Sequence, residues 1–440
     1  MAGHIPQGAA PAGGPKRVTV YAWLVFALSF GLLISDYMAR QVLNAVFPLL
    51  KAEWVLSDAQ LGLLSGIVAV MVGLLTFPLS LAADRWGRVR SLTLMAALWS
   101  LATLLCAVAK SYPTMLIGRA LVGIGEAAYG SVGIAVVIAV FPARLRATLS
   151  AAFMAGGLFG QVLGVATGGV IAASHGWRAA FAAIGMAGMV LAVLYPLVVK
   201  ERRIAALAND AKVAASGSAA MPLRELIGNR SVRLAYFASG LQLFAAGALP
   251  AWLPSYLNRY YALPVDKAGS LAALLLLVCG IGMILCGMIS DRAARDKPDA
   301  KITLAISYSL GSATSLTLAM LLPPGLPQLL MLGVAMFLVA GTVGPVGAMV
   351  ANLTPLAIHG SAFATLTLAN NLLGLAPGPI LTGRIADAIG LAEAFRLLPI
   401  PCVLAGLTYA LMYRSYRADL AVRQTRDKMV SPAGFEPATY

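Results

Sequence analysis

The sequence predicts an all-α membrane protein whose twelve transmembrane helices form two pseudo-symmetric six-helix bundles. Three observations support this fold class. Of the 440 residues, 60 % are hydrophobic and 11 % are charged, and the mean hydropathy is +0.84, whereas an average soluble chain carries about 25 % charged residues. Long apolar segments follow one another along the chain, with short charged loops between them. Features of the first half of the chain also recur in the second half.

Twelve apolar segments are long enough to cross a bilayer, which takes about 20 helical residues. Six make the first half of the chain, at residues 18–50, 57–83, 91–109, 113–141, 147–173 and 177–199. Ser57 and Gln60 have the spacing of a capping box at the start of the second segment. Six more make the second half, at residues 231–256, 268–289, 302–322, 328–352, 361–386 and 391–414.

A charged hairpin, Ser80 to Arg90, separates the second and third segments. Because the bilayer interior excludes charges, this hairpin lies at the membrane surface, and its arginines mark the cytoplasmic side. A weaker copy stands 207 positions later. We expect the hairpins to form a cytoplasmic gate, and the alternative is that their charges only fix the topology. The gate candidates are Asp84, Arg85, Arg88, Asp291 and Arg292.

The halves of the chain align at nearly fixed offsets. Asp84 aligns with Asp291 at 207 positions, and Gly160 aligns with Gly374 at 214 positions. Such self-similarity indicates a duplicated unit. Two parallel six-helix repeats around a central site are an architecture of secondary transporters.

The remaining segments are polar and lie outside the membrane. We expect a disordered N-terminal tail (1–17), an N-terminal bundle (18–199), a cytoplasmic linker (200–230), a C-terminal bundle (231–416) and a C-terminal tail (417–440). Most Lys and Arg residues lie in the tails, the linker and alternate loops, so both termini are expected in the cytoplasm. The net charge of +15 is therefore topological, and no nucleic-acid partner is expected.

The charged hairpin, its copy and the long linker resemble the major facilitator superfamily, over about residues 18–417. Ser80 stands where the pattern of this family usually has Gly, while Gly287 keeps it in the second copy. A finer resemblance is to the spinster-like branch, through Arg40-Gln41, the segment from Ser57 to Gly62, and the segment Gly123 to Ala127. That branch usually has an acid directly before the arginine, where this chain has Ala39 and the nearest acid is Asp36.

Four charged residues are expected within the membrane in the first half. Asp36 and Arg40 are four positions apart on one helix face, and Arg119 and Glu126 are seven apart on another. A charge in the middle of a membrane costs roughly 2.5 to 3.5 kcal/mol, so we expect the four to share a cavity. Arg40 and Arg119 would bind an anionic substrate there. The alternative is that they are fixed braces, which suits Arg119 best because it lies near a helix end.

The two acids are the candidates for proton coupling. Glu126 lies among small apolar residues, which favour its neutral form, whereas Asp36 lies one turn from Arg40. We therefore expect Glu126 to carry the proton, with Asp36 as the alternative. A permanent salt bridge of Glu126 that sets packing is the competing interpretation.

Three amides complete the candidate substrate site in the second half. Gln242 is expected to face the cavity, and Asn370 and Asn371 either face it or bond to neighbouring backbone. The histidines have no partners at metal-ligand spacing, and no nucleophile, base and orienting group are grouped together. We therefore expect no metal, no cofactor and no enzymatic activity.

The sequence thus predicts a secondary active transporter in the cytoplasmic (inner) membrane. It would move a small organic anion or amphiphile by alternating access, with protons and membrane lipids as its other partners. The alternatives are a multidrug or lipophilic efflux antiporter and a non-transporting membrane receptor.

Overall fold

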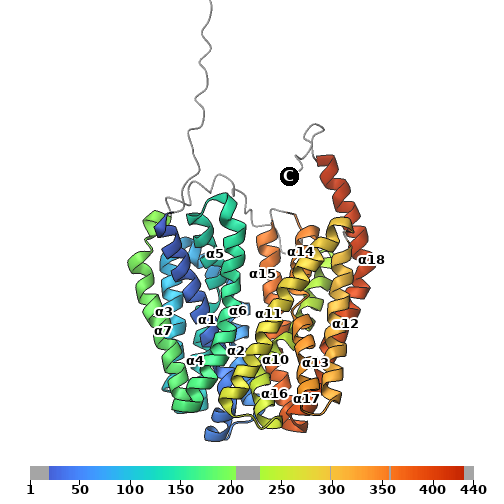
Figure 1. The fold of residues 1–440 in the computed structure, drawn as a ribbon. Helices are drawn as coiled ribbons and strands as arrows, with labels where there is room; N and C mark the ends of the chain where they lie inside the picture. The colour runs from blue at the N-terminus through green and yellow to red at the C-terminus, as the bar shows by residue number, and fades with distance from the viewer. Residues whose placement is uncertain (1–18, 205–227, 298, 356–357, 431–440) are drawn as a thin grey trace, which may run out of the picture.

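A computed structural model shows two helical bundles that stand side by side (Figure 1). It describes residues 19–204, 228–297, 299–355 and 358–430, and these residues include no strand. The predicted N-terminal tail and most of the predicted linker lie outside the described residues.

Each bundle is built from one half of the chain. The N-terminal bundle contains α1 (Val20–Trp54), α2 (Asp58–Trp86), α3 (Arg88–Ala107), α4 (Tyr112–Glu126), α5 (Tyr129–Val140), α6 (Ala143–His175) and α7 (Trp177–Val198). The C-terminal bundle contains α10 (Arg230–Tyr260), α11 (Val265–Asp296), α12 (Ala300–Leu321), α13 (Leu326–Val339), α14 (Val343–Leu353), α15 (His359–Asn370), η2 (Asn371–Leu375), α16 (Pro377–Ile389), α17 (Leu391–Leu397) and α18 (Pro399–Val430).

Eleven stretches of the described chain are long and apolar enough to cross a membrane. The remaining predicted span, residues 361–386, is made of α15, the π-helical turn η2 and α16 in succession. A π-helical turn interrupts the regular hydrogen bonding of a helix, so this span is divided into shorter helices. The fold class of twelve spans in two bundles is thereby confirmed.

Two further predicted spans are broken near their middle, and the prediction of continuous helices there is wrong. Residues 113–141 divide into α4 and α5 at Ala127 and Ala128, and residues 328–352 divide into α13 and α14. The first break is stabilised by α2, because the Thr76 hydroxyl donates a 2.7 Å hydrogen bond to the carbonyl of Ala127. The two breaks occur at equivalent places in the repeat.

The first charged hairpin is as tight as its sequence suggests. Gly87 alone joins α2 to α3, with φ of +98°, a backbone conformation that favours glycine. The second copy differs, because α11 runs on to Asp296 rather than ending at residue 289. Its residues Asp291 to Arg295 contain no Gly or Pro that would end a helix, so this copy lies on a helix rather than in a loop.

Small residues bring the helices close together. On α6, Gly160 packs so closely on α1 that an added Cβ would lie 2.6 Å from the carbonyl oxygen of Ile34. Between the bundles, Gly62 of α2 meets the carbonyl of Pro379 on α16, and Gly169 of α6 meets Gly269 of α11. Glycine stripes of this kind allow close helix approach within a membrane.

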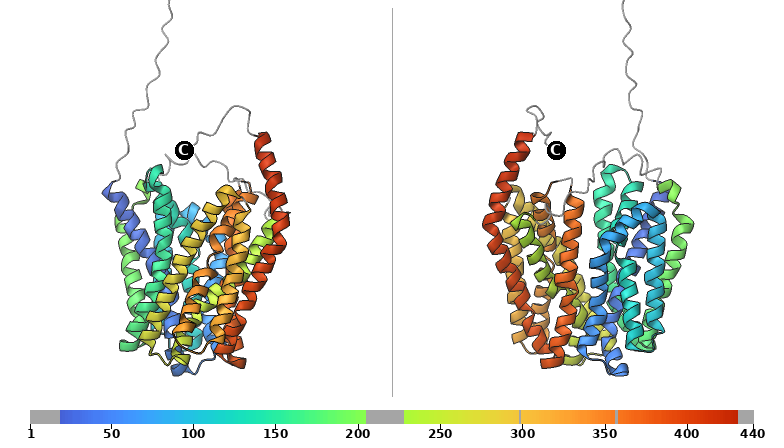
Figure 2. Two further views of the ribbon diagram at one scale, coloured as in Figure 1. Left: turned by 45° about the vertical axis from the view of Figure 1, so that its right-hand side comes forward. Right: turned by 180° about the vertical axis from the view of Figure 1, so that it is seen from behind.

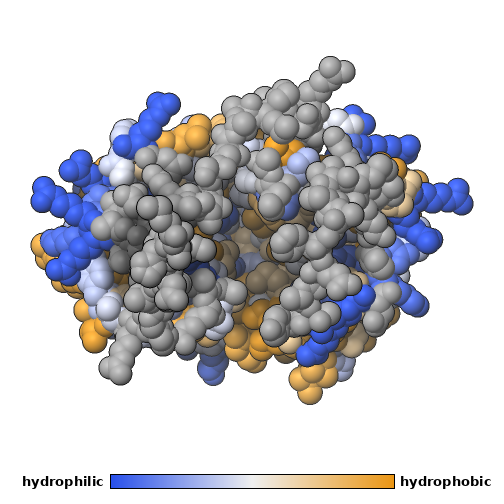
Figure 3. Space-filling view, turned by 90° about the horizontal axis from the view of Figure 1, so that it is seen from above, coloured by the Kyte–Doolittle hydropathy of each residue, from blue (hydrophilic) through white to orange (hydrophobic). Residues whose placement is uncertain are grey.

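The two ends of the molecule differ. We call the end where α1 begins and α18 ends the terminal end, and the opposite end the closed end; both are visible in two further views (Figure 2). Seen from the terminal end, the surface is hollowed between the bundles, and hydrophobic side chains are visible within the hollow (Figure 3).

Candidate functional site

Three of the predicted charged residues meet between α1 and α4. A guanidinium nitrogen (Nη1) of Arg40 lies 3.9 Å from a carboxylate oxygen (Oε2) of Glu126. The Asp36 carboxyl group is close enough to Glu126 to interact with it directly. One oxygen of each acid, Oδ1 of Asp36 and Oε1 of Glu126, is buried without a hydrogen-bond partner in the described structure. We call Asp36, Arg40 and Glu126 the charged cluster.

The pairing within the cluster differs from the sequence prediction. The side chain of Arg40 contacts the acid of α4 rather than Asp36 one turn away on its own helix. Its side chain is 21 % exposed, whereas that of Glu126 is 5 % exposed. Arg40 is therefore the most exposed member of the cluster. Glu126 ends α4 at the break described above, so its position depends on that break.

Arg119 has a bracing geometry, because its hydrogen bonds are to backbone carbonyls of neighbouring helices. Its side chain is fully buried and donates to backbone carbonyls of Ala39 and Arg40 on α1, each at 2.8 Å, and of Leu64 on α2 at 3.3 Å. Although Arg119 and Glu126 share one helix face, the ion pair of Glu126 is with Arg40 and not with Arg119. This geometry favours the alternative that Arg119 is a fixed brace, and it does not support a direct role in substrate binding.

A chain of polar side chains, which the sequence analysis missed, crosses three helices beside the charged cluster. Gln41 of α1 donates to Gln161 of α6 at 3.2 Å, and Asn44 donates to Gln41 at 2.6 Å. Ser65 of α2 then donates to Asn44 at 3.1 Å. Gln41 and Asn44 are spaced for one helix face next to Arg40, which is the sequence feature that points to this chain.

The three amides of the second half have different surroundings. Gln242 is fully buried and donates to Ser312 of α12 and to the carbonyl of Val339 on α13. It therefore ties helices together inside the C-terminal bundle, and the expectation that it faces the cavity is wrong for this conformation.

Asn370 and Asn371 lie where α15 passes into η2. Asn370 is partly exposed and accepts a hydrogen bond from Ser239 at 2.7 Å. Asn371 donates to the carbonyl of Thr367 at 2.9 Å, and its amide oxygen is buried without a partner. An added Cβ on Gly73 of α2 would lie 2.9 Å from Asn371, so this residue stands at the junction of the bundles.

The hairpin side chains that the structure describes form no hydrogen bond or ion pair between the bundles. Asp291 pairs with Lys301 of α12 at 3.1 Å, and Arg85 and Arg292 are exposed. The side chain of Asp84 lies outside the described part of the structure. The backbone N–H of Arg88 donates to Glu201 at 3.0 Å.

Glu201 is a further residue that the sequence analysis did not single out. Its carboxylate accepts from the backbone N–H groups of Arg88, Val89 and Arg90 at the start of α3. A carboxylate at a helix N-terminus satisfies free donors and interacts favourably with the helix dipole. Among the described residues, no group of three His, Cys, Asp or Glu side chains is arranged to hold a metal ion.

Two repeated helical bundles that bury a charged cluster between α1 and α4 are typical of multi-pass membrane transport proteins. The chain belongs to the Major Facilitator Superfamily, whose sequence profile matches residues 28–372. This confirms the family that the hairpin and its copy suggested. The chain is thus a membrane transporter and not an enzyme.

Several relatives resemble the chain along most of its length. It is 24 % identical over 418 residues to the hexuronate transporter of Bacillus subtilis, covering 92 % of this chain and 96 % of that protein. It is 25 % identical over 426 residues to the gallate transporter of Pseudomonas putida, covering 89 % and 92 %. It is also 25 % identical over 417 residues to protein spinster homolog 1 of Xenopus laevis, covering 90 % and 78 %. The predicted likeness to the spinster-like branch is therefore confirmed.

A solved structure shares the same fold. It is the crystal structure of a bacterial homolog to the human lysosomal transporter Spinster, in an inward-facing and unoccupied conformation. The TM-score is 0.76 at 20 % sequence identity, covering 92 % of this chain and 99 % of that one.

Proposed function

We propose that the chain is a proton-coupled transporter of a small organic anion, which works by alternating access in the cytoplasmic (inner) membrane. The terminal end would face the cytoplasm, because hydrophilic side chains rim it (Figure 3) and exposed arginines such as Arg85 and Arg292 lie there. The hollow would then be open to the cytoplasm.

The contact between Arg40 and Glu126 is the observation that carries this proposal. At 3.9 Å it is longer than a charge-assisted hydrogen bond, which is about 2.7 to 2.9 Å. A substrate carboxylate that enters the hollow competes with Glu126 for the same guanidinium. The names of the hexuronate and gallate transporters support a carboxylate substrate.

Proton coupling follows from the charges of the cluster. With both acids ionised, Asp36, Arg40 and Glu126 carry one net negative charge, which repels an anion. Protonation of Glu126 makes the cluster neutral and frees Arg40 to bind the substrate. Proton and anion binding would then favour each other, as in a symporter.

Asn370 and Asn371 are the groups that we assign to the C-terminal side of the substrate site. The partly exposed amide of Asn370 and the unpartnered amide oxygen of Asn371 would bind polar groups of the substrate when the bundles close over it. The hairpin residues Asp84, Arg85, Arg88, Asp291 and Arg292 would form the cytoplasmic gate in the opposite conformation, in which the terminal end is shut.

Uptake into proteoliposomes tests the proposal. We expect an inward proton gradient to drive accumulation of a radiolabelled carboxylate, such as a hexuronate or gallate, and other carboxylates to compete with it. Liposomes without protein are the control. Competition by lipophilic cations but not by carboxylates would instead favour the efflux antiporter, and no movement of any solute would favour the receptor.

A further inference from the structure

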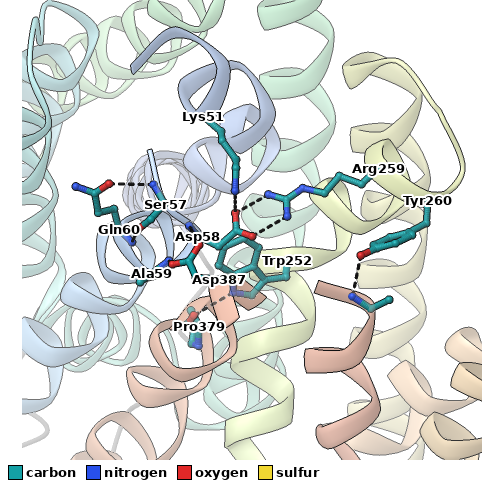
Figure 4. A network of polar contacts seen from close by, with 11 residues as sticks. Lys51, Ser57, Asp58, Ala59, Gln60, Trp252, Arg259, Tyr260, Pro379 and Asp387 are labelled. Carbon is teal, nitrogen blue, oxygen red and sulfur yellow. Dashed lines mark hydrogen bonds and ion pairs between the residues drawn. The ribbon is translucent and has the colours of Figure 1, made fainter. Parts of the chain in front are cut away.

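At the closed end, a buried acid forms ion pairs with cationic side chains of both bundles (Figure 4). Asp58 is the first residue of α2, and its side chain is 4 % exposed. Both of its oxygens accept from Arg259 of α10, at 2.6 and 2.7 Å. Lys51 of α1 donates to the same carboxylate at 2.5 Å. A two-pronged contact between arginine and a carboxylate is among the stronger polar interactions in proteins.

A second acid holds the start of α2 from the opposite bundle. The Asp387 carboxylate, at the end of α16, accepts from the backbone N–H groups of Asp58 at 2.7 Å and Ala59 at 2.8 Å. The first N–H groups of a helix have no partner within the helix. Asp387 therefore supplies to α2 a partner that its own bundle does not provide.

The surroundings of these bonds are tightly packed. An added Cβ on Gly383 of α16 would lie 2.3 Å from the backbone oxygen of Asp58 and 2.8 Å from Trp252. The indole N–H of Trp252 on α10 donates to the carbonyl of Pro379 at 3.0 Å, and its ring lies 5.1 Å from that of Phe47 on α1. The Asp58 carboxylate, at 4 % exposure, is largely shielded from water, which strengthens its charge pair with Arg259.

We infer that Asp58, Arg259 and Asp387 form a gate that closes this end of the transporter and that must open in every transport cycle. The bonds from Asp58 to Arg259 and from α2 to Asp387 join the N-terminal bundle to the C-terminal bundle. Separation of the bundles at this end breaks them together. The gate stabilises the conformation that is open at the terminal end. It presupposes the alternating access proposed above, but not the identity of the substrate.

Another polar contact at the same end provides a matched control. Glu53 of α1 accepts from Arg178 at 2.8 Å and from the indole N–H of Trp177 at 2.6 Å, both on α7. This contact also involves an acid, an arginine and a tryptophan, but it lies within the N-terminal bundle. Opening of the closed end leaves it intact.

Spin-label distances across the closed end test the gate. Labels are attached to cysteines at Ala52 and Ile389, two exposed positions on α1 and α16, in a variant whose four native cysteines are replaced. We expect pulsed electron paramagnetic resonance to give mainly the short distance. Asp58→Asn should raise the population with a longer distance about tenfold or more, because hydrogen bonds to charged groups are lost. Glu53→Gln should leave the distances unchanged.

Further variants identify the bond between the bundles. Arg259→Gln should lengthen the distance as Asp58→Asn does, and the double variant should add little to either, because both remove the same interaction. Lys51→Gln removes a partner within the N-terminal bundle and should have a smaller effect. Asp387→Asn should also favour the longer distance, but less, because this residue is exposed.

The distances test the gate separately from the transported solute. Unchanged distances in both Asp58→Asn and Arg259→Gln, in protein that elutes as a single folded species, would overturn the gate. An equal response to Glu53→Gln would also overturn it. Failure to transport any carboxylate would contradict the proposed function, and the distances would still decide on the gate.

Discussion

Replacement of Glu126 by Gln should make substrate binding tighter and independent of pH. The change removes the charge that competes for Arg40 while it preserves the shape of the side chain. Two unit charges at the observed 3.9 Å attract each other by about 4 kcal/mol at an effective dielectric constant of about 20. Water screens part of this attraction, because the Arg40 side chain is 21 % exposed. We therefore expect a gain of about 2 kcal/mol, or about 30-fold in Kd.

Calorimetric titration of a transported carboxylate into purified protein measures this effect. The titration is repeated at several pH values from about 5 to 8, on both sides of neutral pH. Wild-type affinity should weaken as the pH rises and Glu126 loses its proton, whereas the Glu126→Gln affinity should stay constant. In proteoliposomes the variant should lose accumulation driven by a pH gradient and keep exchange between equal pools, since exchange needs no change of protonation. A Kd for Glu126→Gln that still varies with pH refutes the reasoning. If Asp36→Asn removes the pH dependence instead, Asp36 is the proton carrier.

Substitutions at three other residues separate the roles of the remaining charges. Arg40→Ala should abolish anion binding and Arg40→Lys should retain part of it, and an unchanged Kd in Arg40→Ala would rule out Arg40 as the anion site. Arg119→Lys should lower the melting temperature, because the loss of two of three hydrogen bonds from a charged group costs about 3 kcal/mol. It should leave the Kd of the substrate unchanged. A weaker Kd at unchanged melting temperature would instead indicate that Arg119 binds the substrate. Asp84→Asn should preserve the Kd and slow net transport. If the transport rate per protein molecule equals that of the wild type, the hairpin does not act as a gate.

Hydropathy and the internal repeat were sufficient to predict the fold, because burial in lipid imposes long apolar segments. The helix breaks could not be predicted in the same way. No proline marks the break at Ala127, and the carbonyl at this break is satisfied by Thr76, 51 positions earlier in the chain. A break of this kind depends on contacts between helices, which the sequence of one segment does not contain.

The members of the charged cluster were predictable, but their partners were not. Spacing along one helix placed Arg40 on the same face as Asp36, and Arg119 on the same face as Glu126. The structure instead joins Arg40 to Glu126 across two helices, and it turns Arg119 toward the backbone of α1 and α2. Helical periodicity shows which residues share a face but does not show how one helix is rotated against the next.

The internal repeat of the sequence indicates candidate gate residues at one end of the transporter but not at the other. The hairpins at the terminal end are present in both halves of the chain, so their alignment drew attention to them. At the closed end, the position equivalent to Asp58 at the same offset is Val265, which carries no charge. The bonds of Asp58 connect residues 201 positions apart, and those of Asp387 connect residues 329 positions apart. A gate made from residues without a counterpart in the repeat is recognised only when the structure shows how the two bundles meet. Substitutions in this gate can change how the closed end opens without altering the hairpins at the terminal end.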